Sequence, residues 1–219
     1  MELKKIIMQV ARVSALISAI VTILVSCSDK PEDTIANLKT AITGELTTNA
    51  TYLAFAVKAT EEGHRYIANM FLATAAAEEI HARNHNDVLK KLGEREYKPT
   101  VVALTVMGTL ENIQSAVDGE THEYTVTYPG LIATAKKEKC EDAVTSFTLA
   151  NLAEENHAKQ YAEALKSLKD EGNDKKVSSR WFVCAQCGGM FKETFAKCSL
   201  CRADAERQYF IPRVFDADH

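Results

Sequence analysis

Two Glu-x-x-His motifs constrain the fold of this chain: Glu78 with His81, and Glu154 with His157. Each motif lies in a long segment whose apolar residues recur every three or four positions, the period of one helix face. A spacing of three residues places both side chains of a motif on the same face, one turn apart. A single glutamate precedes each motif in a matching order, because 120 − 45 = 75 and 154 − 78 = 76. The pattern predicts long helices that direct these side chains into a common interior.

Four helical segments are expected, over residues 34–62, 66–92, 106 to at least 128, and 141–169. Glycine follows the first, second and fourth segments, as is common where helices end, and a bend is expected at Pro129. The 219 residues include only 4 Pro and 9 Gly, which favours helices over a turn-rich β fold. A long connection joins the second and third segments, so the prediction is an all-α, ferritin-like four-helix bundle over residues 27–172.

The acidic and histidine side chains of these segments form a candidate two-metal site. Four carboxylates and two imidazoles suffice to bind two irons and leave positions open for an oxygen ligand. A lone helical glutamate is usually a solvated surface residue, and a lone Glu-x-x-His arises often by chance. Chance does not readily explain six such residues that occur in matching order in the two halves and lie on the helix faces that carry core residues. The predicted ligands are Glu45, Glu78, His81, Glu120, Glu154 and His157.

Four C-terminal cysteines form a second candidate metal site. Cys184 and Cys187 make one Cys-x-x-Cys pair and Cys198 and Cys201 another, with 10 residues between the pairs. Paired motifs of this spacing indicate one tetrahedral site, for which iron and zinc are both suitable. Two disulfides are the alternative in an exported protein. We assign residues 181–219 to a small metal domain and the polar stretch 173–180 to a linker.

The pattern of the N-terminal residues indicates a targeting segment. Lys4, Lys5 and Arg12 precede an uncharged apolar run over residues 13–25, which is too short to span a bilayer but fits a signal peptide. The run ends in Leu-Val-Ser-Cys27, which resembles a bacterial lipobox. This interpretation makes residues 1–26 a signal peptide and Cys27 a lipidated residue that anchors an exported protein to a membrane. The alternative is an uncleaved anchor that starts at Ile6, which Arg12 disfavours.

Taken together, the helical segments resemble the rubrerythrin family. The resemblance covers most of the chain after residue 38 and rests on these matches: Gly44-Glu45, Asn49, Tyr52 and Phe55; Glu78-x-x-His81; Gly119-Glu120-x-His122-Glu123-Tyr124 and Tyr128-Pro129; and Ala153-Glu154-Glu155-x-His157. Glu123 is distinctive, because it adds a seventh potential ligand. The resemblance implies that one iron moves between His81 and Glu123 as the redox state changes.

The resemblance also implies roles for other residues of the site. Glu78 and Glu154 would bridge the two irons. Tyr52 and Tyr128 match family tyrosines that hydrogen-bond to ligand carboxylates, which orients ligands and steadies their charge. The four-cysteine segment resembles a rubredoxin-like domain that holds iron for electron transfer, although Ser199 and a shortened loop depart from that pattern and keep zinc open.

The activity implied is that of a peroxidase, which reduces hydrogen peroxide to water with electrons relayed through the four-cysteine iron. Family members assemble head to tail, so a homodimer or larger assembly is expected, with an unidentified electron donor. The alternatives are a ferroxidase or other iron-handling protein, and a membrane-tethered metal-binding module without turnover. A net charge of −4 without a basic stripe argues against nucleic acid as a partner.

Overall fold

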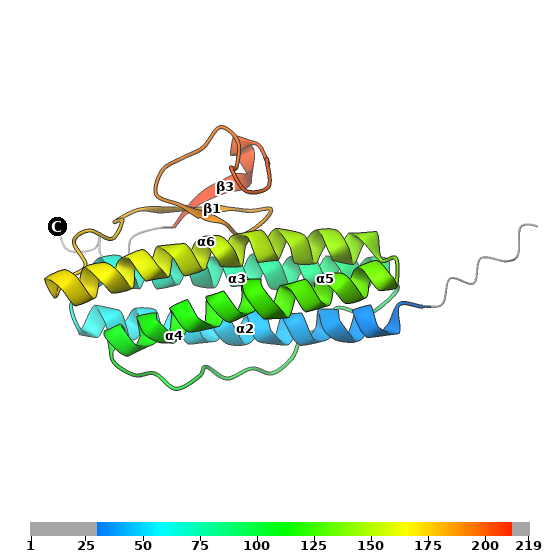
Figure 1. Cartoon of the computed structure of the whole chain (residues 1–219), viewed down its shortest axis with the longest axis horizontal. Coiled ribbons are helices and arrows are strands. Elements are labelled where there is room, and N and C mark those ends of the chain that lie inside the picture. Colours follow the sequence, from blue (N-terminus) through cyan, green and yellow to red (C-terminus); the bar gives the residue numbers. More distant parts are fainter. Residues whose placement is uncertain (1–29, 212–219) are drawn as a thin grey trace, which may run out of the picture. The chain divides into compact units, whose positions relative to one another are not determined.

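The computed structural model describes residues 30–211, so the lipobox at Cys27, the apolar segment before it and residues 212–219 lie outside the described residues. Four long helical stretches lie side by side (Figure 1). They are α2 (Glu32–Glu61), α3 (Arg65–Lys91), the run of α4 (Thr109–His122), η1 (Glu123–Thr127) and α5 (Tyr128–Lys137), and α6 (Glu141–Glu171). Within this part of the chain, no helix is long and apolar enough to cross a membrane.

The bundle confirms the predicted all-α fold. The first, second and fourth predicted helices agree with α2, α3 and α6 to within two residues at each end. The C-terminal end of α6 shows why the glycine signal works. Gly172 closes this helix in the left-handed conformation, with φ of 66°, and its N–H donates to the carbonyl of Leu168. Glycine adopts that conformation without the steric cost that a Cβ brings.

The third helix differs from the prediction in its start and in its irregularity. It begins at Thr109 rather than near residue 106. The five residues before α5 form a π-helix, in which the N–H of Tyr128 donates to the carbonyl of Glu123 five residues earlier. Pro129 follows this widened turn, in the first turn of α5, where its missing N–H costs little.

The π-helix changes which residues share a face. In a regular α-helix, Glu120 and Tyr128 would point about 80° apart, because each residue turns the chain by about 100°. A π-turn accommodates one extra residue, which reduces that difference to about 20°. Both side chains are in fact buried, Glu120 at 2% and Tyr128 at 1% exposure. The widened turn therefore aligns Tyr128 with the ligand face of α4.

Two apolar clusters fill the bundle on either side of the ligand residues. On α3, the first cluster ends at Ile80 and the second begins at Ala82. The first contains the mutually packed rings of Tyr52, Phe55, Phe71 and Tyr161, and the second contains those of Tyr128 and Phe147. The acidic and histidine residues of α3 thus lie at the junction of two close-packed regions, which limits the entry of water.

A small three-stranded antiparallel sheet follows the helices. Its strands are β1 (Trp181–Cys184), β2 (Met190–Phe191) and β3 (Gln208–Ile211), in the order β2-β1-β3. Phe182 of β1 pairs with Phe191 on one side and with Phe210 on the other. A short 3-10 turn, η2 (Ala205–Arg207), precedes β3. Trp181, Val183 and Met190 belong to the same apolar cluster as the core of the bundle, so the sheet packs directly on the helices.

Candidate di-metal centre and four-cysteine site

The six predicted ligands of the bundle come together in its interior. Each is at most 3% exposed, although four of them carry carboxylates. They form two overlapping groups whose ligand atoms lie within 4.8 Å of one another: Glu45, Glu78, His81 and Glu154, and Glu78, Glu120, Glu154 and His157. Glu78 and Glu154 belong to both groups. The arrangement is that of two adjacent metal positions with two shared carboxylates.

The first position is centred on Nδ1 of His81. This atom lies 2.9 Å from Oε1 of Glu154, 3.1 Å from Oε2 of Glu78 and 3.6 Å from Oε2 of Glu45. An imidazole nitrogen that faces three carboxylate oxygens is a ligand set suited to a divalent cation. The helical spacing makes this possible, because Glu78 and His81 are one turn apart on α3.

The second position repeats this geometry around Nδ1 of His157. This atom lies 2.8 Å from Oε2 of Glu154, 3.4 Å from Oε2 of Glu120 and 3.6 Å from Oε1 of Glu78. Glu78 and Glu154 each direct one oxygen to His157 and the other to His81. This division of oxygens is what carboxylates that bridge two metals require.

The other ring nitrogen of each histidine is held by the C-terminal segment of the same chain. Nε2 of His81 lies 2.9 Å from the carbonyl oxygen of Cys187, and Nε2 of His157 lies 3.2 Å from that of Gly188. A carbonyl only accepts hydrogen bonds, so each Nε2 carries a proton and donates it. This leaves Nδ1 of a neutral imidazole free to bind metal, an orientation typical of metal-ligating histidines.

The donor set fits a pair of bound cations. Within residues 30–211, one oxygen of each carboxylate in the set (Glu45, Glu78, Glu120 and Glu154) accepts no hydrogen bond. Burial and the charges of neighbouring carboxylates, first that of Glu154, raise the pKa of Glu78 well above its ordinary value. The same charges raise the pKa of His81, against the opposing effect of burial. Buried carboxylates with unsatisfied oxygens are stabilised by cations placed among them.

Two tyrosines hold the outer carboxylates of the set. The hydroxyl of Tyr52 donates to Oε1 of Glu120, and that of Tyr128 donates to Oε1 of Glu45. Burial and the adjacent carboxylates raise the pKa of both phenols well above the ordinary value, so both remain protonated donors. Each of these glutamates therefore has one oxygen fixed by a tyrosine and the other directed towards a histidine.

A buried hydrogen-bonded chain behind Tyr128 is a feature that the sequence left open. His85 is buried, with Nε2 at 3.1 Å from the hydroxyl of Tyr128 and Nδ1 at 2.7 Å from Oγ of Ser146. The sequence signal was its position one turn after His81, but that position did not distinguish a buried residue from a surface one. His85 and Ser146 thus fix Tyr128, which in turn holds Glu45.

The burial of His85 leads to a prediction about pH. Burial lowers the pKa of His85 from 6.5 to about 4. Between these values the unfolded chain binds more protons than the folded protein, so stability falls as pH falls through this window. The shift corresponds to on the order of 3 kcal/mol. We expect the melting temperature of the protein to approach that of a His85→Gln variant as pH falls from 7 to 4; a constant difference between the two would contradict this.

Glu123, the seventh candidate, belongs to neither group of converging ligand atoms. It occupies the first position of η1 and is half-buried. Burial and the charges of Glu45, Glu154 and Glu120 raise its pKa well above the ordinary value, so its carboxyl group is within electrostatic reach of the site. His122, its neighbour, is exposed.

The four cysteines converge at the end of the sheet. Sγ of Cys184 is 3.7 Å from that of Cys201, and Sγ of Cys187 is 3.8 Å from that of Cys198. A tetrahedron of thiolates about 2.3 Å from a metal has sulfur–sulfur distances of about 3.8 Å, whereas a disulfide requires about 2.05 Å. The cysteines are free thiols that match a metal tetrahedron, so the disulfide alternative is wrong. The side chain of Cys187 and nearby N–H groups lower the pKa of Cys184 to about 5, despite burial, which favours a thiolate.

Polar side chains of the bundle fasten the loop between β1 and β2 over the histidines. Nη2 of Arg83 donates to the carbonyl of Ala185 at 3.0 Å, and Nδ2 of Asn84 donates to that of Gln186 at 2.8 Å. From α6, Oδ1 of Asn156 accepts the N–H of Met190 at 2.8 Å. Through these contacts the four-cysteine segment lies over the candidate di-metal centre of the same chain.

Comparisons with known proteins agree with this pair of sites. The family model described as Rubrerythrin matches residues 36–165. The chain is 38% identical to nigerythrin of Nitratidesulfovibrio vulgaris over 77% of this chain and 81% of that protein. It is 34% identical to rubrerythrin-2 of Clostridium acetobutylicum over 75% and 89%. The structure of fully reduced, all-ferrous nigerythrin superimposes with a TM-score of 0.72 at 36% identity, covering 81% of this chain and 86% of that chain.

Proposed function

Because this chain belongs to the rubrerythrin family and carries the residues for a di-iron site and for a four-cysteine iron or zinc site, we propose that it is a non-haem di-iron peroxidase. The reaction is H2O2 + 2H+ + 2e− → 2H2O. The observation that carries the proposal is the pair of histidine-centred positions that share Glu78 and Glu154. When bound, the two irons supply the two electrons that break the O–O bond.

In this proposal, Glu45 and His81 would hold one iron, Glu120 and His157 would hold the other, and Glu78 and Glu154 would each offer one oxygen to both. Tyr52 and Tyr128 keep their protons and hold the carboxylates of Glu120 and Glu45 by hydrogen bonds. These carboxylates would therefore keep their positions when the charge of the metals changes. The close-packed clusters on both sides exclude water, which strengthens electrostatic interactions at the site.

We assign the exchange of ligands between redox states to His81 and Glu123. His81 is the imidazole ligand candidate of one metal position. Glu123 is an additional carboxyl group within electrostatic reach of that position. A carboxylate compensates a higher metal charge better than a neutral imidazole does, so Glu123 suits the oxidised state and His81 the reduced state. Glu123 begins a π-helix, an element that often occurs at functional sites.

The four-cysteine site is the proposed entry point for electrons. Cys187 is both a thiolate ligand candidate and the residue whose carbonyl accepts the hydrogen bond from His81. Cys187 thus links the two candidate metal sites through its thiol and its backbone carbonyl. This role requires iron, since zinc has no accessible redox change.

Metal analysis, visible absorption and a peroxide titration of the reduced protein test the proposal together. We expect three irons per chain, the red colour of an oxidised iron–thiolate centre, and one peroxide consumed for every two electrons withdrawn from the di-iron site. A colourless, zinc-loaded four-cysteine site would contradict the relay. Iron uptake far beyond three per chain would favour iron handling instead of peroxide reduction.

We also propose that the protein forms a homodimer or larger assembly. The segment before α4 and the first turn of α4 carry five exposed apolar side chains. Helix α2 adds two more close to this segment, where the N–H of Leu104 donates to Oγ1 of Thr51. The exposed set is Leu53, Val57, Val102, Leu104, Val106, Met107 and Leu110. Exposed apolar patches of this kind mark interaction surfaces. Sedimentation equilibrium checks the assembly, and a monomer at micromolar concentration would contradict it.

Export and lipidation at Cys27 are proposed from the sequence alone, on the charged start, the apolar run and the lipobox. The protein would then act at a membrane surface, with an electron donor that is not identified. Cell fractionation checks this proposal. We expect the protein in the membrane fraction and a Cys27→Ser variant outside it; a soluble wild-type protein would contradict the anchor.

A further inference from the structure

The loop of residues 185–189, between β1 and β2, connects the four-cysteine site to the candidate di-metal centre through backbone atoms. Its carbonyl groups at Cys187 and Gly188 accept the Nε2–H of His81 and of His157, one for each metal position. Both imidazoles are at most 1% exposed, so bulk water does not readily replace either acceptor. The loop therefore holds one ring nitrogen of each histidine, and with it the direction in which the other nitrogen points.

The cysteines determine the shape of this loop. The N–H of Gly188 donates to the carbonyl of Cys184 at 2.8 Å, so Cys184 and Cys187 stand at the two ends of one turn. Each directs its sulfur to the second pair, Cys184 to Cys201 at 3.7 Å and Cys187 to Cys198 at 3.8 Å. A metal bound to all four thiolates would fix both ends of the turn, and with them the carbonyl groups that the histidines use.

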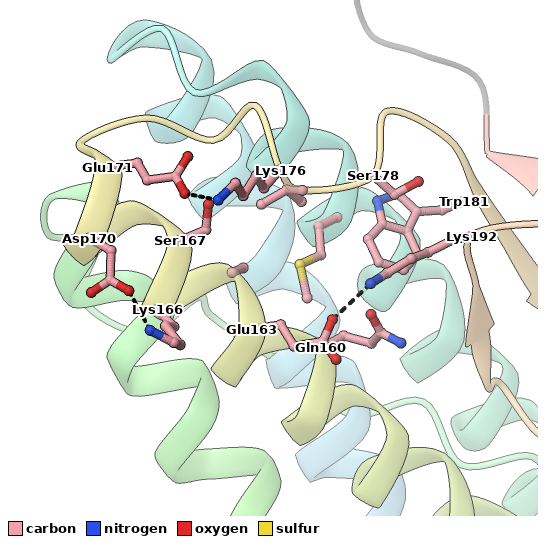
Figure 2. A pocket seen from close by; sticks show the side chains of 13 residues that line it. Gln160, Glu163, Lys166, Ser167, Asp170, Glu171, Lys176, Ser178, Trp181 and Lys192 are labelled. Carbon is pink, nitrogen blue, oxygen red and sulfur yellow. Dashed lines mark hydrogen bonds and ion pairs between the residues drawn. The ribbon is translucent and has the colours of Figure 1, made fainter.

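The rest of the segment is attached to the bundle by residues other than the cysteines. Trp181, the only tryptophan in the sequence, is 1% exposed and belongs to the apolar cluster of the bundle core. Lys192 pairs with Glu163 of α6 at 2.8 Å, and Figure 2 shows this pair and Trp181 around one cavity beside α6. Loss of a metal from the four cysteines would therefore loosen the loop while the sheet stays docked.

A loosened loop would leave both histidines less suited to bind metal. A neutral imidazole carries its proton on either nitrogen, and only the form protonated at Nε2 offers a free Nδ1 to a metal. The carbonyls of the loop select that form, because a carbonyl can only accept a hydrogen bond. Without these acceptors, a proton on Nδ1 is favoured instead, since Nδ1 of His81 and of His157 each lies within 2.9 Å of an oxygen of Glu154.

We propose that the four-cysteine site has a second function, which is to prepare the di-metal centre for metal binding. The loop of residues 185–189, fixed when the four cysteines bind a metal, keeps both histidines in the form and orientation that bind metal. Loss of a group that orients a ligand histidine typically lowers metal affinity by about 10- to 100-fold. Coupling between binding sites is reciprocal, so the two sites load cooperatively. This inference rests on the proposed pair of metal positions but on neither peroxide reduction nor the electron relay, so zinc at the cysteines serves as well as iron.

Calorimetric titration of the full-length protein with manganese(II) tests the proposal without redox chemistry. One equivalent of zinc fills the four cysteines first, because thiolates favour zinc and carboxylates suit manganese. The comparison is a Cys198→Ser/Cys201→Ser variant, which retains the six ligands of the bundle. We expect two manganese ions per zinc-loaded chain, at least about tenfold weaker binding of both by the variant, and unchanged fluorescence of Trp181 where the sheet stays docked. Equal manganese affinities of the two proteins overturn the proposal, whereas no manganese binding by either would contradict the di-metal centre itself.

Two variants that keep all four cysteines test the loop even if the double cysteine variant does not fold. Asn84→Ala removes the donor to the carbonyl of Gln186 in the loop. It should weaken manganese binding by about 2- to 12-fold, the value of one neutral hydrogen bond. Lys192→Ala is the matched control, because it removes an exposed ion pair with Glu163 that also joins the segment to the bundle but lies outside the loop. It should bind manganese like the parent protein, and equal affinities of the two variants overturn the role of the loop.

Discussion

Replacement of Gly188 by alanine is expected to displace the four-cysteine loop from the di-iron site. A Cβ at this position would lie 2.4 Å from Nε2 of His81, a contact that real structures do not tolerate. His81 is 1% exposed and is held among carboxylates, so it has no free space into which to move. The loop must therefore shift, and the hydrogen bonds from His81 to Cys187 and from His157 to Gly188 are lost.

We expect Gly188→Ala to lower stability by about 3–5 kcal/mol, which sums the strain of a left-handed alanine, the contact and two lost hydrogen bonds. Gly93→Ala is a matched control. Its φ of 80° is close to the 78° of Gly188, but nothing lies within 4 Å of its added Cβ. Thermal unfolding measures the first effect, and reoxidation of the four-cysteine iron after peroxide addition measures the relay. Equal unfolding temperatures and equal reoxidation rates of the two variants would show that the loop does not contact His81.

Removal of the Glu123 carboxyl group is expected to separate iron binding from turnover. The six residues of the two metal positions remain in a Glu123→Ala variant, so we expect it to retain two irons per bundle. Peroxide reduction should slow by about 10- to 100-fold, the usual cost when a group that tunes a metal site is lost. Loss of a half-buried carboxyl group that already suffers from burial and from neighbouring negative charges should affect stability less than activity.

His122→Ala is the matched control for Glu123→Ala, because it alters the adjacent but exposed side chain. Iron analysis and stopped-flow peroxide kinetics of both variants provide the comparison. Peroxide kinetics unchanged in Glu123→Ala would rule out Glu123 as the exchanging ligand. Loss of both irons in that variant would instead make Glu123 a permanent ligand.

The helices and the convergence of the six candidate ligands could be predicted from the sequence because their signals are local. Apolar periodicity identified α2, α3 and α6, and a spacing of three residues placed Glu78 with His81 and Glu154 with His157. The four cysteines were recognisable for the same reason, since each Cys-x-x-Cys pair lies in one tight turn, closed by N–H bonds to the carbonyls of Cys184 and Cys198. Such features depend on residues close to one another in the chain.

The features that the sequence did not predict depend on residues that meet only in the folded protein. His85 is buried because Ser146 of α6 and Tyr128 of α5 accommodate both of its ring nitrogens. The loop over the histidines is held by Arg83, Asn84 and other side chains far from it in sequence. The π-helix has no local composition that separates it from an α-helix, so a bend at the nearby proline was the natural expectation.

The π-helix has a consequence for how a ligand set of this kind can be extended. A residue inserted into a regular helix rotates everything after it by about 100°, which would turn Tyr128 away from Glu45. A widened turn absorbs the extra residue locally, so Glu120 before it and Tyr128 after it both stay in the interior. An additional carboxyl group at Glu123 is therefore compatible with an otherwise unchanged site. A four-helix bundle with six ligands can acquire a seventh through a one-residue insertion, without redesign of its core.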